Sequence, residues 1–383
     1  MVSRWLLFGG IFVFVSGLTL SVPTHGQTDV VSDAPPAVRQ FDTDLTQSTI
    51  DLSELVAGGP SKDGIPSIDD PEFVSTDAAS KWIGDNEPVI VLSRNDDARA
   101  YPLQILMYHE IVNDRICDTP VAVTFCPLCY SSIAFERVVD GKTVTFGVSG
   151  LLRKSDLVMY DRASETLWQQ FTGEAIVGTH AGKTLTVLPS QLMSFRQFTE
   201  NYPGGQVLSR DTGYERPYGT NPYAGYDDID EPPFAFEGAT DDRLPPKARV
   251  VGVTIDSVHR AYPHSITRSD RVIHDTVADR AIVVFHAPGA VSAVDATQIS
   301  DSKDVGSTGV FLRTVKGTRL DFSYAGSGRF RDENTGTVWS VAGHAIKGPL
   351  KGANLEPVAH GDYFAFSWLA FRPNATIFRS ENE

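Results

Sequence analysis

The chain has 383 residues, of which 41% are hydrophobic and 21% charged, and its formal net charge is −15. These proportions are those of a soluble globular protein and exclude a fibrous or wholly disordered chain. The length allows two or three domains. Because the sequence has no run of lysine or arginine, we expect no nucleic-acid partner.

Residues 1–26 have the pattern of a secretory signal peptide. One basic residue, Arg4, precedes an apolar run from Trp5 to Leu20, and small residues follow that run. The alternative is an uncleaved membrane anchor, but the apolar run is short for a membrane span. We therefore expect an exported protein, periplasmic or extracellular, with no membrane association once the signal is cleaved.

The rest of the chain divides into a leader, two related copies and a linker. Residues 27–71 are rich in Asp, Ser, Thr, Pro and Gly, which predicts a flexible leader that partly wraps the globular part. We place the first copy at 72–212 and the second copy at 248–380. Between them, residues 213–247 form a linker rich in Tyr, Pro and Gly, and a linker of this length usually has a role of its own.

An internal repeat is the basis for the two copies. The segment ARAYPLQILMYHEIVND (98–114) resembles HRAYPHSITRSDRVIHD (259–275). Further along, Trp168 and Gly178 correspond to Trp339 and Gly348. We infer a duplicated unit whose two copies pack about a pseudo-twofold axis.

Each copy is expected to be mainly β, since short runs rich in Val, Ile, Thr and Phe alternate with turn signals. A short helix is expected at 103–111, where apolar residues share one helical face. A second helix is expected at 190–201, with Ser190 as its N-cap. The predicted fold class is therefore mainly β, an α+β protein with few short helices and two similar β-rich halves.

Three motifs occur in a fixed order along the first copy: HEIVND at 109–114, TFCPLC at 124–129 and TGEAIVG at 172–178. Together they resemble the motifs of a widespread prokaryotic family of unknown function. The resemblance covers about residues 80–375 and implies no established activity. One departure is that the second copy has His274 where the first has Asn113.

The repeat separates scaffold residues from candidate functional residues, because a residue that the scaffold needs should recur in both copies. The cysteine pair of the first copy does not recur. We align Cys126 with His286 and Cys129 with Gly289. The third cysteine, Cys117, lies outside the family motifs.

Three interpretations of the cysteine pair remain open. Two thiolates separated by two residues can bind one metal ion, and His109 is then the natural third ligand. Thiolate and imidazole ligands suit zinc or copper, between which the sequence does not choose. The same spacing also occurs in thiol–disulfide redox pairs, although strand-like flanks disfavour that interpretation. The third interpretation is a static disulfide, or small thiols filling a core.

His109 and Glu174 complete the set of candidate site residues. Each lacks an identical counterpart, since His109 is opposite Asp270 and Glu174 is opposite His344. His109 is a candidate metal ligand or proton-transfer group, and Glu174 is a carboxylate that could reach a metal or act as a base. No residue is assigned as catalytic beyond these candidates.

Two functional hypotheses follow. The first is a thiolate–imidazole metal or redox site in the first copy, with copper or zinc as the cofactor and a small molecule or metal as the ligand. The second is a non-catalytic extracellular binding module with a structural Cys126–Cys129 disulfide. In this second case Tyr218, Tyr223 and Tyr226 of the linker would line a ligand groove between the copies.

Overall fold

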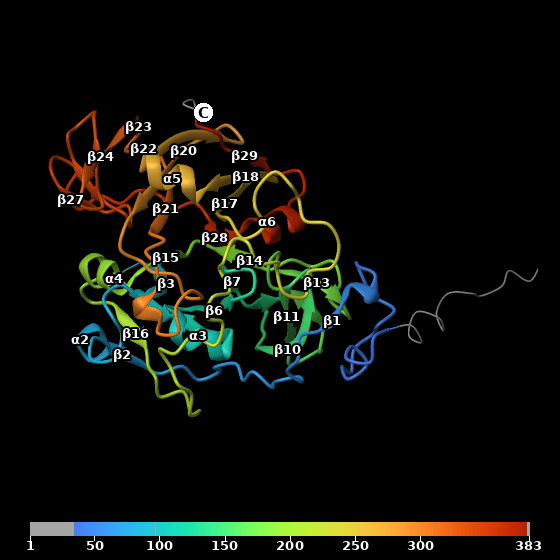
Figure 1. Cartoon of the computed structure of the whole chain (residues 1–383). Coiled ribbons are helices and arrows are strands. Elements are labelled where there is room, and N and C mark those ends of the chain that lie inside the picture. The colour runs from blue at the N-terminus through green and yellow to red at the C-terminus, as the bar shows by residue number, and fades with distance from the viewer. Residues whose placement is uncertain (1–33, 96, 381–383) are drawn as a thin grey trace, which may run out of the picture.

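The computed structural model describes residues 34–95 and 97–380, so the expected signal peptide at 1–26 lies outside the described residues. Figure 1 shows two β-rich halves, with the later part of the chain (orange and red) above the earlier part (cyan and green). Strands predominate, and the helices are short, which confirms the mainly β fold class. Within the described ranges, no helix has the length and apolarity needed to cross a bilayer.

The first half contains three sheets and one small hairpin. The first sheet comprises, in spatial order, β15 (Gln191–Ser194), β3 (Pro88–Arg94), β4 (Asp97–Pro102), β16 (Gln206–Leu208) and β2 (Phe73–Ser75). The second comprises β14 (Thr186–Leu188), β7 (Ser131–Glu136), β6 (Thr119–Cys126) and β5 (Ile111–Ile116). The third comprises β1 (Val56–Ala57), β10 (Phe146–Arg153), β11 (Asp156–Asp161), β12 (Leu167–Gln169) and β13 (Glu174–Val177). The hairpin joins β8 (Val138–Val139) to β9 (Lys142–Thr143).

The second half also contains three sheets and one small hairpin. Its first sheet comprises β28 (His360–Phe364), β17 (Arg249–Ile255), β18 (Val258–Pro263) and β29 (Thr376–Ile377). The second comprises β19 (Val272–Val277), β20 (Arg280–Ala287) and β21 (Ser307–Leu312). The third comprises β24 (Phe322–Gly326), β25 (Arg329–Asp332), β26 (Val338–Ser340) and β27 (Ala345–Lys347), and the hairpin joins β22 (Thr314–Val315) to β23 (Thr318–Arg319).

The helices lie between strands and are all short. The α-helices are α2 (Thr76–Ala79), α3 (Leu103–His109), α4 (Phe195–Asn201), α5 (His264–Asp270) and α6 (Ala365–Phe371), and the 3-10 helices are η1 (Leu52–Glu54) and η2 (Ile299–Asp301). The helix expected at 103–111 ends at His109, because Glu110 adopts a positive φ of 58° and Ile111 begins β5. The helix expected from Ser190 was placed too early. Its N-cap is Ser194, which forms a capping box with Gln197, while the preceding residues form β15.

The two halves share most of their order of elements and most of their strand pairings, although β1, β2 and β14 of the first half have no counterpart among the described strands of the second. In each half an antiparallel hairpin (β3-β4 or β17-β18) leads into a short helix and then a second hairpin (β5-β6 or β19-β20). A late strand then pairs in parallel with the first hairpin, β16 with β4 and β29 with β18. This agreement supports the repeat inferred from the sequence, and the duplication itself stays a prediction.

Buried polar contacts recur as well. The hydroxyl of Tyr101 donates to Asp114 at 2.6 Å, and that of Tyr262 donates to Asp275 at 2.9 Å. In each half an arginine two residues before the tyrosine binds the same carboxylate. These contacts tie the first hairpin of each half to the second, so they belong to the scaffold.

The described part of the expected leader packs against the third sheet of the first half. Val38, Phe41 and Leu45 are buried there against Tyr160 and Ile176. Burial of three such side chains contributes several kcal/mol, on the order of 1.5–3 kcal/mol each. The leader therefore covers the outer face of this sheet.

Trp168 and Trp339 occupy the same position in the two halves, each held by a buried aspartate. Asp161 accepts hydrogen bonds from the N–H of Ser164 at 2.7 Å and from the indole of Trp168 at 3.1 Å. Asp332 accepts hydrogen bonds from the indole of Trp339 at 2.9 Å and from the backbone N–H of Thr335 at 2.6 Å. Each aspartate therefore fixes both a turn and the largest side chain of its sheet.

We expect Asp161→Ala to lower the free energy of unfolding by about 3 kcal/mol, because it leaves the buried indole N–H of Trp168 and the part-buried backbone N–H of Ser164 without an acceptor. Denaturant unfolding of the purified protein measures this loss. The control is Asp118→Ala, at an exposed position with no side-chain partner among the described residues, which should change stability by less than about 0.5 kcal/mol. A loss below about 1 kcal/mol for Asp161→Ala would contradict the assigned role.

Candidate functional site

Two cysteines and one aspartate meet inside the first half. One potential ligand atom from each of Cys126, Cys129 and Asp156 lies within 4.8 Å of the others. Cys126 is 1% exposed, and Cys129 and Asp156 are fully buried. Both cysteines are free thiols. The structure thus places the cysteine pair beside a carboxyl group that the sequence analysis did not select.

Local backbone geometry brings the three residues together. Cys126 ends β6, and Cys129 lies in the turn before β7. Asp156 begins β11, directly after a turn in which Lys154 and Ser155 both have positive φ values, 52° and 67°. A turn with two such residues suits a tight hairpin, and it turns the start of β11 toward the cysteines.

The second half holds the cysteine turn in place. The backbone N–H of Phe364 donates to the carbonyl oxygen of Cys129 at 2.9 Å. The guanidinium of Arg249 lies 3.7 Å from the ring centre of Tyr130, the residue after Cys129. The site therefore belongs to the first half but depends on the second for support.

Hydrogen bonds orient the Asp156 carboxylate. It accepts from the side-chain amide of Gln169 at 2.6 Å, from the backbone N–H of Phe171 at 2.9 Å and from the hydroxyl of Ser131 at 3.3 Å. Burial nevertheless raises the pKa of Asp156 to about 7. The three donors fix the direction of the carboxylate without supplying a positive charge.

Glu110 is a fourth acid next to this cluster. It caps α3, is 7% exposed, and forms no side-chain hydrogen bond or ion pair with any residue in the described part of the chain. Burial, and then the neighbouring Asp156, raise its pKa to about 8. Burial likewise raises the pKa of both Cys126 and Cys129. Four acids therefore share one buried region, and none of them is paired with a base that the structure describes.

A cavity of about 680 Å³ lies beside Glu110, between the third sheet and the linker. Its walls are mainly apolar and aromatic: Gly58, Pro60, Ile65, Leu128, Val148, Gly150, Leu151, Leu152, Leu157 and linker residues 222–226 and 232–234. Charged groups enter the lining at Glu110, Glu231 and Lys247. Of the three linker tyrosines expected to line a groove, Tyr223 and Tyr226 line this cavity and Tyr218 does not.

The linker is fastened to the second half by Asp227. This buried carboxylate accepts from the hydroxyl of Ser292 at 2.6 Å and forms ion pairs with Arg249 at 3.0 Å and Lys303 at 2.9 Å. Arg249 is also the residue that stacks on Tyr130. Arg249 therefore connects the linker, which lines the cavity, to the cysteine turn.

His109 and Glu174 lie apart from the cluster. His109 is fully buried, and its two ring nitrogens lie 2.7 Å from the carbonyl oxygen of Pro66 and 2.6 Å from the hydroxyl of Tyr218. Glu174 is the first residue of β13, and its backbone forms an isolated antiparallel β-bridge with Thr184. Neither belongs to the group of ligand atoms around the cysteines, and the third member of that group is Asp156.

The structure shifts the alignment of the two copies by one residue at the cysteines. The backbone N–H of Phe125 donates to the carbonyl oxygen of Glu110, the C-cap of α3. The N–H of His286 donates in the same way to Arg271, the C-cap of α5. The counterpart of His286 is therefore Phe125 and not Cys126, the residue with which we had aligned it. Cys126 instead corresponds to Ala287, and the counterpart of Cys129 is also an alanine. The sequence alignment was wrong here, although the cysteines still occur in one half alone.

Histidines occupy the corresponding interior of the second half. A ring nitrogen of His264 lies 2.7 Å from Asp362, and one of His286 lies 3.0 Å from the hydroxyl of Thr267. Burial, and then the nearby His264, lower the pKa of His286 to about 3. This interior therefore holds His286 in its neutral form and a carboxylate, Asp362, that is paired with His264, unlike the acids of the first half.

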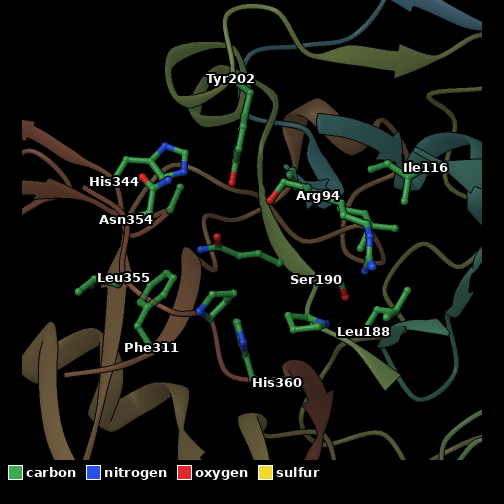
Figure 2. A pocket seen from close by; sticks show the side chains of 17 residues that line it. Arg94, Ile116, Leu188, Ser190, Tyr202, Phe311, His344, Asn354, Leu355 and His360 are labelled. Atoms are coloured by element: carbon green, nitrogen blue, oxygen red, sulfur yellow. The ribbon is translucent and has the colours of Figure 1, made fainter. Parts of the chain in front are cut away.

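A smaller cavity of about 260 Å³ lies between the two halves. Figure 2 shows Arg94 and Tyr202 of the first half on one side of it, and Phe311, His344 and His360 of the second half on the other. It contains none of the clustered acids. Of the two, only the larger cavity is lined by one of the four acids, Glu110, while Cys126, Cys129 and Asp156 line neither.

These features define a mainly β protein with two similar halves and a buried thiol–carboxyl cluster near a cavity that the linker helps to line. The chain belongs to the family DUF3179, described as a protein of unknown function, which matches residues 62–375. That range includes both cysteines, Asp156, Glu110 and the linker. Searches of the curated proteins and of the solved structures gave no match.

The burial of His286 predicts how stability depends on pH. Its pKa falls from 6.5 in the unfolded chain to about 3 in the folded protein, so the unfolded state binds a proton that the folded state excludes. This stability is complete above pH 6.5 and is lost as the pH falls toward 3. Between pH 8 and pH 5 the wild type should lose about 2 kcal/mol more than His286→Gln, measured by denaturant unfolding. Equal pH dependence in the two proteins would contradict a buried neutral His286.

Proposed function

We propose that Cys126, Cys129 and Asp156 bind one metal ion, zinc or copper, and that this centre serves the adjacent cavity. The observation that carries the proposal is the meeting of three potential ligand atoms within 4.8 Å in a buried site. We also infer, from the pattern of residues 1–26, that the protein is exported. The centre would then work in the periplasm or outside the cell.

The chemistry of the donors favours a borderline or soft cation. Two thiolates and one carboxylate are ligands that zinc accepts, with metal–sulfur distances of about 2.3 Å and metal–oxygen distances of about 2.1 Å. Ligand atoms around such an ion lie roughly 3.5–4 Å apart. Atoms already within 4.8 Å of one another therefore need only small movements to reach a metal.

The surroundings of Asp156 support the same assignment. Carboxylates that bind metals are commonly held by hydrogen bonds from neighbouring groups, and these neighbours set the orientation of the ligand. The donors from Gln169, Phe171 and Ser131 fit that role. Replacing Gln169 should accordingly weaken metal binding without removing a ligand.

A redox pair is less well supported than a metal site. The reactive form of a redox cysteine is the thiolate, which a nearby positive charge or helix N-terminus stabilises. Here burial raises the pKa of both thiols, and the neighbouring charges are acids. A bound cation would supply the positive charge that this environment lacks.

We expect protein purified from its native host to contain close to one zinc or copper ion per chain, measured by inductively coupled plasma mass spectrometry. The double variant Cys126→Ser/Cys129→Ser should lose at least nine-tenths of this metal, because it removes both sulfur ligands. Asp156→Asn should bind the metal at least tenfold more weakly. Cys117→Ser is the matched control, since Cys117 is an exposed thiol outside the cluster, and it should keep its full metal content.

Two results would contradict the metal proposal. One is full metal content in the double variant. The other is metal-free native protein in which mass spectrometry finds a Cys126–Cys129 disulfide, which would instead favour the non-catalytic binding module.

A further inference from the structure

Glu110 is a buried carboxyl group that the protein itself leaves without a partner. It is 7% exposed and lines the cavity, yet no donor or base among the described residues binds it. Burying a carboxylate in this way is costly unless a partner of opposite charge arrives. The unsatisfied group therefore points to something that enters the cavity.

The other charges of the cavity do not provide that partner. Lys247 is buried, but its amine donates to the carbonyl oxygen of Tyr226 at 2.7 Å and lies 4.1 Å from the centre of the Tyr226 ring. Glu231, at the exposed rim, adds a second negative charge. The lining thus has two carboxyl groups, Glu110 and Glu231, and one cation, Lys247, which is already bound to Tyr226.

The walls indicate the rest of the ligand. Leu128, Leu151 and Leu157 offer an apolar surface, and Tyr223 and Tyr226 add aromatic rings. Aromatic rings attract ammonium groups through their faces, most strongly where water is excluded. The volume of about 680 Å³ is within the usual range for small-molecule sites.

We propose that this cavity binds a small apolar amine, with the ammonium group paired to Glu110 and the hydrocarbon part against the leucines and tyrosines. The inference deepens the proposed function and in part rests on it. A divalent ion held by two thiolates and one carboxylate leaves one net negative charge next to Glu110, which further favours a cation over an anion in the cavity.

Three probes of equal length test the proposal: 3-phenylpropylamine, 3-phenylpropan-1-ol and 3-phenylpropanoate. Calorimetric titration of the metal-loaded full chain should show the amine binding at least tenfold more tightly than the alcohol, and the carboxylate more weakly still. Glu110→Gln should abolish the preference for the amine over the alcohol. Glu231→Gln, the matched change at the rim, should alter amine affinity by less than about threefold because exposed ion pairs contribute little.

Equal affinity for the amine and the alcohol in the wild type would overturn the proposal, as would a preference that Glu110→Gln leaves unchanged. The wild-type comparison decides the matter alone should Glu110→Gln fail to fold. Metal content measured on the same samples separates the two proposals. If the purified protein prefers the amine but contains no metal, the cavity proposal stands and the metal proposal fails. If it contains the metal but shows no preference for the amine, the metal proposal stands and the cavity proposal fails.

Discussion

Four acids buried together without a base are the constraint on which this account depends. Cys126, Cys129, Asp156 and Glu110 lie in the interior of the first half, and burial raises the pKa of each. Asp227, another buried carboxylate, has two cations beside it, whereas in the described part of the chain the buried Asp161 and Asp332 are held by neutral hydrogen-bond donors alone. A group of buried acids with no cation beside it either stays protonated or receives a cation from outside. The proposed metal ion for the cluster and the proposed amine for Glu110 would meet that need in two different ways.

The repeated framework explains where such a site can be built. The contacts shared by both halves, such as that of Asp161 with Trp168 and that of Tyr101 with Asp114, recur at matching positions of the two halves. The site residues lie instead at positions where the halves differ: the end of β6, the cap of α3 and the turn before β11. The second half is still needed, because Arg249 contacts both Tyr130 of the cysteine turn and Asp227 of the linker that lines the cavity.

The mainly β fold and the short helix after Pro102 could be predicted from the sequence, since each depends on local patterns. The third member of the cluster was harder to predict, because Asp156 reaches the cysteines only through strand pairing and a turn with positive φ at Lys154 and Ser155. Nothing in the local sequence marks that carboxyl group as buried. Glu110 could have been found, because its counterpart in the second half is an arginine, and the same comparison selected the cysteines. We selected His109 instead, and in the structure its two ring nitrogens lie within hydrogen-bonding distance of Pro66 and Tyr218.

The most direct measurement is X-ray absorption spectroscopy at the metal edge of the purified, metal-loaded protein. The account predicts two sulfur atoms at about 2.3 Å together with oxygen at about 2.1 Å, and no contribution from the outer atoms of an imidazole ring. A first shell made only of nitrogen and oxygen, or one with clear imidazole scattering, would contradict a centre formed by Cys126, Cys129 and Asp156.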